Sequence, residues 1–239
     1  MTNTSYRTLD NKSERIVSSF LANHYYSVLK ANGSIAGFET ITDPALQRRG
    51  VDFIVTNTDG TKTNVDLKAA VAYINESLPT QAFELSSLFG GKVVQGWLFN
   101  NRLETDRYLI ATNITGRPIG DKVKYDYVDA MQYSDLRSID VFEVPRQRLI
   151  CYLDSLGLTH DVLEGYSRTM REHNILDKDI TDGIKIKFSS HLAERPVNLV
   201  IRKSILLKLA DSAYTVTRTS MRPLANKNGK EQINGHQNS

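Results

Sequence analysis

The sequence has a single cysteine, Cys151, among its 239 residues. One cysteine can form neither a disulfide framework nor a zinc site built from cysteines, and it fits a reducing compartment. Long apolar runs are also missing, since no stretch approaches the roughly 18–20 residues that a membrane span needs. The N-terminal residues lack the charged start and apolar stretch of a secretory signal. We therefore expect a cytoplasmic protein with no membrane partner.

Two common sources of chemistry are missing as well. The five histidines show no spacing that is typical of metal ligands. The segment Gly90-Gly91-Lys92 lacks the glycine spacing, and the hydroxyl after lysine, of a Walker-type phosphate loop. Any chemistry must therefore come from other residue types.

The composition is that of an ordinary globular protein, with 40% hydrophobic and 24% charged residues. The net charge of +3 is unevenly divided along the chain. Residues 184–239 contain ten Lys/Arg and three acids, whereas the preceding 183 residues contain 20 bases and 24 acids. Such asymmetry indicates a polyanionic partner, or else a basic region that only aids solubility. The acidic excess upstream is compatible with binding a divalent cation.

The apolar pattern predicts a mixed α/β (α+β) protein with a core at residues 13–113. A polar leader at residues 1–12 precedes it, and an α/β extension at 114–222, basic toward its C-terminal end, packs against it. Residues 223–239 have little to bury and are expected to be a disordered tail. In the core, the helix begins at an N-cap at Ser13 and ends at Asn32-Gly33. Strands at 38–42, 51–56 and 63–68, a short helix at 79–90, and strands at 93–99 and 107–112 follow. In the extension we expect strands at 138–144, 184–188 and 197–201, and helices at 145–153, 159–173 and 204–210.

The informative residues are Asp52 on one strand and Asp66 and Lys68 on the next. Asp59-Gly60 between the strands predicts a hairpin, and the loop length decides whether these side chains meet. A two-residue turn would place Asp52 opposite Leu67 and send the two acids to opposite faces. A three-residue loop, with Gly60 at the left-handed position, would place Asp52 opposite Asp66 and Lys68 on the same face. Because Gly60 suits that position, we expect the second register.

Two carboxylates about 5 Å apart across a strand pair repel each other, so that a structural role alone is a poor explanation. Lys68 offsets part of the repulsion, and a hard divalent cation would offset more. Mg²⁺ binds oxygen ligands and commonly uses one or two carboxylates together with a substrate phosphate. Metal and ammonium together suit phosphodiester hydrolysis, in which a metal-bound water is the nucleophile. The alternative is an ion-pair ladder on the surface of a hairpin.

This combination of acids, lysine, glycine turn and element order resembles the PD-(D/E)XK nuclease superfamily, with its restriction-endonuclease-like fold. The family core runs helix, three antiparallel strands, helix, strand, and residues 13–99 follow the same order. The resemblance implies that Asp52 and Asp66 bind metal, with the Leu67 backbone carbonyl as a further ligand, and that Lys68 is the motif lysine. Val51 stands where the family name has proline. Residues 73–84 also resemble predicted nucleases of bacterial mobile elements.

The resemblance implies a Mg²⁺-dependent enzyme, with Mn²⁺ as a substitute, that hydrolyses DNA. Glu14 matches a position where many members carry an additional acid, although the helix dipole also favours an acid there. Gln81 and Glu84, three apart on the predicted short helix, are further candidates, and capping or solvation explains them equally well.

Among the C-terminal bases, we expect nucleic-acid phosphate contacts from Lys185, Lys187, Arg202 and Lys203. A rival interpretation is a non-catalytic module that binds nucleic acid or a partner protein through the same fold. A homodimer is a further alternative that the sequence leaves open.

Overall fold

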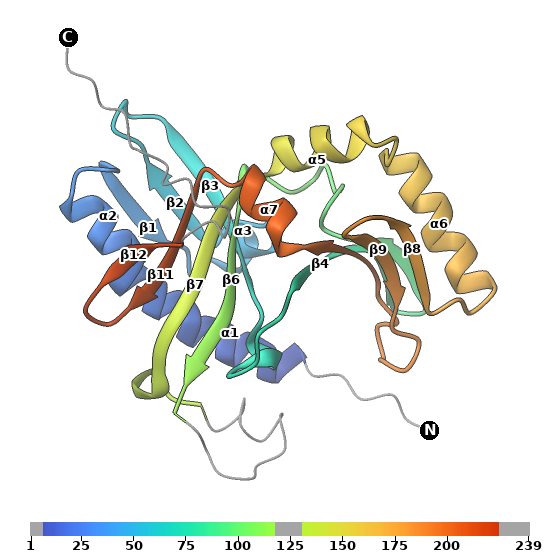
Figure 1. Ribbon diagram of the computed structural model, residues 1–239, viewed down its shortest axis with the longest axis horizontal. Helices are drawn as coiled ribbons and strands as arrows, with labels where there is room; N and C mark the ends of the chain where they lie inside the picture. Colours follow the sequence, from blue (N-terminus) through green and yellow to red (C-terminus); the bar gives the residue numbers. More distant parts are fainter. Residues whose placement is uncertain (1–6, 118–130, 225–239) are drawn as a thin grey trace.

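The computed structural model describes residues 7–117 and 131–224 and contains two β-sheets flanked by helices (Figure 1). The larger sheet has seven strands, in the order β1 (Gly37–Thr40), β2 (Phe53–Thr56), β3 (Lys62–Ala69), β6 (Arg107–Gly116), β7 (Leu136–Pro145), β11 (Ser212–Thr217) and β12 (Met221–Pro223). The smaller sheet has five, in the order β5 (Lys92–Gln95), β4 (Thr80–Phe89), β10 (Val197–Arg202), β9 (Ile184–Phe188) and β8 (Asp177–Thr181). All strand neighbours are antiparallel except β3 and β6, which are parallel. The mixed α+β class is therefore confirmed.

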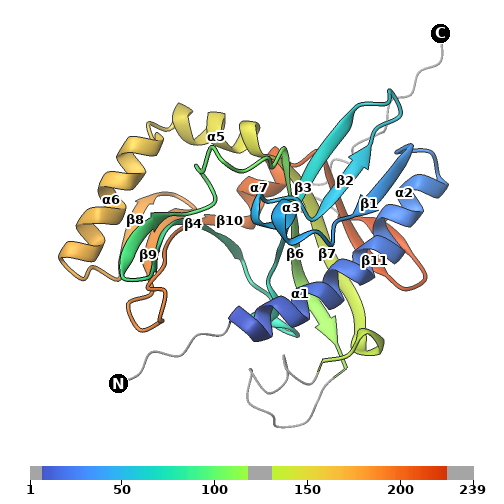
Figure 2. The ribbon, with the colours of Figure 1, turned by 180° about the vertical axis from the view of Figure 1, so that it is seen from behind.

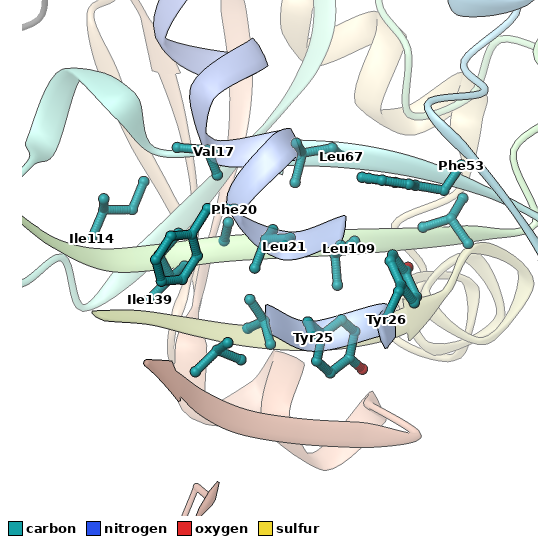
Figure 3. Packing of buried hydrophobic residues seen from close by; sticks show 14 of the residues in the cluster. Val17, Phe20, Leu21, Tyr25, Tyr26, Phe53, Leu67, Leu109, Ile114 and Ile139 are labelled. Atoms are coloured by element: carbon teal, nitrogen blue, oxygen red, sulfur yellow. The ribbon is translucent and has the colours of Figure 1, made fainter. Parts of the chain in front are cut away.

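The first helical segment consists of α1 (Arg7–Leu21), the π-helical turn η1 (Ala22–Tyr26) and α2 (Ser27–Ala31). The predicted start at Ser13 is wrong, because the helix already begins at Arg7 and Ser13 is buried within it. Part of the expected polar leader is therefore helical. Figure 3 shows the apolar side of this segment, including Phe20 and Tyr26, packed against side chains of the larger sheet.

The predicted helix at residues 79–90 is also wrong, since this segment forms strand β4. Phe83 and Leu85 are buried two residues apart, and β4 pairs with β5 and with the distant strand β10. Pairing with distant residues thus outweighs the helical spacing that Leu88 suggested. The connection between the parallel strands β3 and β6 runs through η2 (Val71–Tyr73) and the β4–β5 hairpin, where the nuclease-like order would have a helix.

Buried side chains form two clusters, one on each face of the larger sheet. Leu67 and Leu109 belong to the cluster under α1. Tyr108 and Ile110 belong to the cluster shared with the smaller sheet and with α5 (Arg146–Ser155) and α6 (His160–Glu172). Because side chains alternate along a strand, Asp66 lies on the second face, away from Leu67. Figures 1 and 2 show α6 beside the smaller sheet and α1 across the larger one.

Most elements of the C-terminal half follow the prediction. The strands at 138–144, 184–188 and 197–201 and the helices α5, α6 and α7 (Lys203–Leu209) are confirmed. The sequence did not predict α3 (Pro44–Arg48), η3 (Tyr133–Asp135), β8, β11 or β12. The ranges 13–113 and 114–222 each contribute strands to both sheets. Most of the expected tail, residues 225–239, lies outside the described residues.

Within the described part of the chain, no helix has the length and apolar character needed to cross a membrane.

Candidate metal and phosphate site

The β2–β3 hairpin has the predicted register. Phe53 is paired with Val65 and Thr56 with Lys62, which leaves the three-residue loop 58–60 beyond the Asn57–Thr61 pair. Gly60 has φ +85°, the left-handed conformation that glycine adopts without strain. The turn chemistry therefore fixes which residues of the two strands face each other.

Asp52 lies one residue before β2, at the irregular end of the ladder. Its N–H donates to the carbonyl of Val65 at 2.9 Å, and Val65 is also the residue that pairs with Phe53. Its Oδ2 accepts a hydrogen bond from the N–H of Leu67 at 2.7 Å. A carboxylate thus takes the position where the next strand-to-strand hydrogen bond would form, and the ladder ends there.

Asp66 and Lys68 form an ion pair on the same face of β3. The Lys68 Nζ lies 2.8 Å from Asp66 Oδ1 and 4.6 Å from the centre of the Trp97 ring. A carboxylate and an aromatic face together hold the ammonium in place. The lysine is therefore restrained by one neighbour on its own strand, Asp66, and by Trp97, which follows later in the sequence.

The second oxygen of Asp66 has no hydrogen-bond partner among the described residues. The residue is only 3% exposed, and Oδ2 itself is buried. Asp66 Oδ2 lies 3.6 Å from the position that a Cβ would occupy on Gly50, whose φ is +74°. Since an unsatisfied buried carboxylate oxygen is costly, a bound cation or a hydrogen-bond donor at this atom would stabilise the folded protein.

The electrostatics of the cluster follow from burial and from the paired acids. Burial raises the pKa of Asp52 to about 6, and the charge of Asp66 adds to that rise, against the opposing effects of the Leu67 N–H and Lys68. Burial by itself would lower the pKa of Lys68, but the charges of Asp66, Asp52 and Glu14 raise it above its ordinary value. The lysine is therefore charged at neutral pH, whereas Asp52 takes up its proton as the pH falls through about 6.

These residues line one cavity of about 380 Å³ between α1, α3 and the β2–β3 hairpin. Glu14, Arg15 and Ser18 border it from α1, and Pro44, Gln47 and Arg48 border it from α3. α3 is itself capped by Asp43, whose Oδ1 accepts from the N–H of Ala45 at 2.7 Å. The cavity therefore combines one buried acid, one partly buried acid and a lysine with two arginines at its border.

The donor set fits a hard divalent cation. Leu67 also lines the cavity, although its side chain is buried in the core under α1. In an extended strand the N–H and C=O of one residue point to the same edge, so that the Leu67 carbonyl is directed to the side of Asp52. Asp52, Asp66 and this carbonyl are the oxygen ligands that Mg²⁺ prefers, and Asp66 Oδ2 has an unfilled bonding position.

The other predicted residues separate into two groups. Gln81, Lys185 and Lys187 line a neighbouring cavity together with Glu14. Glu84 accepts a hydrogen bond from Ser87 and does not line the cavity that contains Asp52.

Arg202 and Lys203 bind other parts of the chain. Arg202 pairs with Asp182 at 3.1 Å, and Lys203 donates to Asn113 at 2.8 Å. The guanidinium of Arg202 and the ammonium of Lys203, which were expected to contact nucleic-acid phosphates, are thus bound to other residues of the chain.

Sequence reasoning missed two aromatic neighbours of the cluster. The ring of Trp97 contacts the Lys68 ammonium. Tyr108 lies beside Asp66 across the β3–β6 pairing, and burial raises the pKa of its phenol to about 12. Its hydroxyl is buried without a hydrogen-bond partner among the described residues. Only the parallel β3–β6 pairing places it there, and no local sequence pattern indicates that pairing.

A second group of potential ligands lies on α6. His160, Asp161 and Glu164 bring their ligand atoms within 4.8 Å of one another at the surface. His160 and Glu164 are four residues apart on a helix, and this spacing could have been noticed in the sequence.

Comparison with models of known protein families finds no match for this chain, and neither curated proteins nor solved structures match it.

Proposed function

We propose that this protein is a metal-dependent nuclease that hydrolyses phosphodiester bonds in DNA. The observation that carries the proposal is the cavity in which Asp52, Asp66 and Lys68 meet, with one buried oxygen of Asp66 that has no hydrogen-bond partner in the described part of the chain. The proposal also draws on the PD-(D/E)XK-like spacing of these three residues.

A purely structural role explains the cluster poorly. Burying two carboxylates side by side destabilises the folded chain, and Lys68 neutralises only one of them. Burial, and then the charge of Asp66, raise the pKa of Asp52 to about 6. This rise reflects the same unfavourable free energy of holding two negative carboxylates together away from water. A bound cation would remove the penalty, because it neutralises the second carboxylate and gives Asp66 Oδ2 a partner.

Asp52, Asp66 and the Leu67 carbonyl would hold the ion. When bound, Mg²⁺ would stabilise negative charge on a phosphoryl oxygen and lower the pKa of a coordinated water. Lys68 is fixed between Asp66 and Trp97. It would donate a hydrogen bond to the attacking water or to the phosphate oxygen on which negative charge develops.

Residues at the edge of the cavity have supporting roles in this proposal. Glu14 lies in the wall of the cavity, and its negative charge helps to raise the pKa of Lys68. Arg15 and Arg48 stand at the border, where they would contact neighbouring phosphates.

The test is incubation with linear, circular and single-stranded DNA in Mg²⁺ or Mn²⁺, with and without chelator. We expect cleavage that chelator abolishes and that Lys68→Ala lowers by at least about 100-fold, the typical effect of losing one charge-stabilising group. Asp66→Asn should have a similar effect. Lys62→Ala, an exposed lysine on the same strand, and Asp154→Asn, an exposed acid on α5, are the matched controls.

A rival function makes a different prediction in the same assay. A non-catalytic binding module would associate with DNA in a salt-sensitive manner, with or without chelator, and would leave the DNA intact. Cleavage by Lys68→Ala at the parental rate would remove the lysine from the mechanism.

A further inference from the structure

A second cavity, of about 500 Å³, lies next to the proposed metal site. Its lining includes Glu14, Ala69, Tyr73, Gln81, Lys185 and Lys187. Its volume falls within the roughly 300–1,000 Å³ that is typical of small-molecule sites. The two cavities share Glu14, and Ala69 directly follows Lys68 in the chain. The two cavities are therefore adjacent along β3. A nucleic-acid strand bound at the acidic cluster would extend from one cavity into the other.

The wall that carries the lysines is the open face of the smaller sheet. Along β9, Ile184, Ile186 and Phe188 are buried in the core, so that Lys185 and Lys187 project from the opposite face. Lys185 lies across from Val200, and Val200 lies across from Ala82. Small apolar side chains therefore form the floor beside the lysines and leave room for a ligand.

Among the residues that the structure describes, Lys185 and Lys187 have only a weak competing interaction. Lys185 Nζ lies 3.8 Å from a carboxylate oxygen of Asp177, near the limit of an ion pair, and its side chain is substantially exposed. Exposed pairs of this kind contribute about 0–1 kcal/mol, so a phosphate could displace Asp177 with little loss.

The remaining walls suit the other parts of a nucleotide. Tyr73, at the end of η2, keeps 39% of its surface exposed and offers an aromatic face. Gln81 offers an amide that can both donate to and accept from a base edge. Lysines for the phosphate, an aromatic ring for stacking and an amide for the base edge are the groups by which single-stranded nucleic acids are bound.

We propose that this second cavity binds one unpaired nucleotide of the strand whose neighbouring phosphate lies at the acidic cluster. The inference rests on the proposed nuclease function and specifies its substrate class. A base inside a duplex is covered by its neighbours and its partner, and it must leave the stack to enter a pocket. The protein therefore prefers single-stranded DNA, or duplexes with unpaired ends, over blunt duplexes.

The experiment measures binding separately from cleavage. Lys68→Ala protein in chelator is titrated against a labelled single-stranded 12-mer and against the matching blunt duplex, with fluorescence anisotropy as the readout. We expect tighter binding of the single strand. Adding Tyr73→Ala should weaken binding about tenfold, as is typical of losing one stacked base, while Tyr73→Phe should restore it. Adding Lys187→Ala should weaken binding and lower the salt dependence by about 0.7 in slope, as expected for one phosphate contact.

The control variant is Lys178→Ala. Lys178 lies on the neighbouring strand β8, where its Nζ is 5.0 Å from the Tyr166 ring, and it does not line the cavity. Thermal unfolding of every variant shows that it is folded, and the Tyr73→Phe comparison does not depend on the more disruptive change to alanine.

The outcomes separate the two proposals. Equal binding of single strand and duplex, or unchanged binding in both Tyr73→Ala and Lys187→Ala, overturns the nucleotide cavity even if the parent cleaves DNA. Loss of binding in these variants, together with no metal-dependent cleavage by the parent, supports the cavity and overturns the nuclease function.

Discussion

Two buried acids in this protein have very different surroundings. Glu143 accepts hydrogen bonds from Tyr25, Tyr26 and Arg107 at 3.2–3.3 Å, and burial raises its pKa despite these donors. Asp66 has one lysine for Oδ1 and no partner among the described residues for Oδ2. A fully bonded acid is what a structural network requires. The incomplete bonding of Asp66 therefore distinguishes the proposed metal site from the network around Glu143.

The raised pKa of Asp52 gives the first prediction at this scale. Burial raises its pKa in the folded protein to about 6, from an ordinary value of 3.8. The folded state therefore binds the proton more tightly, and this contribution to stability is complete below about pH 4 and is lost as the pH rises through 6. The difference corresponds to about 3 kcal/mol. Without metal, the parent should lose stability relative to Asp52→Asn between about pH 4 and pH 7.

Metal binding should reverse this trend, because the cation competes with the proton for Asp52. Thermal unfolding in Mg²⁺ and in chelator, from about pH 4.5 to pH 8, measures the effect. We expect Mg²⁺ to stabilise the parent more at neutral pH than below about pH 5, and to have little effect on Asp52→Asn. Equal stabilisation at both pH values, or in both proteins, would contradict the assignment of Asp52 as a ligand.

At the scale of single elements, the β2–β3 hairpin sets the site. Gly60 supplies the left-handed position of the loop, and a Cβ added there would meet no atom within 4 Å. Any effect of substitution must therefore come from the backbone conformation and not from a clash.

Gly60→Val places a β-branched residue at positive φ. We expect it to lower the free energy of unfolding by about 1–2 kcal/mol or more, and the melting temperature by several degrees. Gly60→Asn is the matched control, because asparagine tolerates the left-handed region, and its loss should be smaller. Equal melting temperatures for Gly60→Val and the parent would be inconsistent with the observed turn.

The hairpin and the β4 segment show which parts of the structure were predictable. The register between β2 and β3 depends on three loop residues between adjacent strands, so that local turn chemistry predicted it correctly. β4 depends on β10, more than 100 residues later, and its own sequence contains apolar spacings that suit either a helix or a strand. Trp97 and Tyr108 reach the cluster only through the parallel β3–β6 pairing and the β4–β5 connection. The clustering of Asp52, Asp66 and Lys68 could thus be predicted, and their aromatic surroundings could not.

At the scale of the whole molecule, the two sheets are built from both halves of the chain. β4 and β5 precede β6 in sequence, yet they join β8, β9 and β10 in the smaller sheet. β6 pairs with β3 on one side and with β7 on the other. Neither half therefore contains a complete sheet or a complete core.

This arrangement predicts that a fragment of residues 1–113 does not fold alone, although it contains every acid of the proposed site. It lacks β10 and β7, and so it leaves Phe83 and Ile110 without the partners that bury them. We expect no cooperative thermal transition by circular dichroism, while the full chain shows one. A cooperative transition in the fragment would show that the N-terminal half is an independent domain.

The interleaved strands also determine when the protein becomes competent during its synthesis. The ribosome makes Asp52, Asp66 and Lys68 early, but β7, β10, β11 and β12, which the two sheets also contain, appear only later in the chain. Lys185 and Lys187 likewise emerge more than 100 residues after the acids. A nascent or prematurely terminated chain thus carries these side chains without the scaffold that aligns them, and the proposed DNA-cutting activity would be withheld until translation has passed β12.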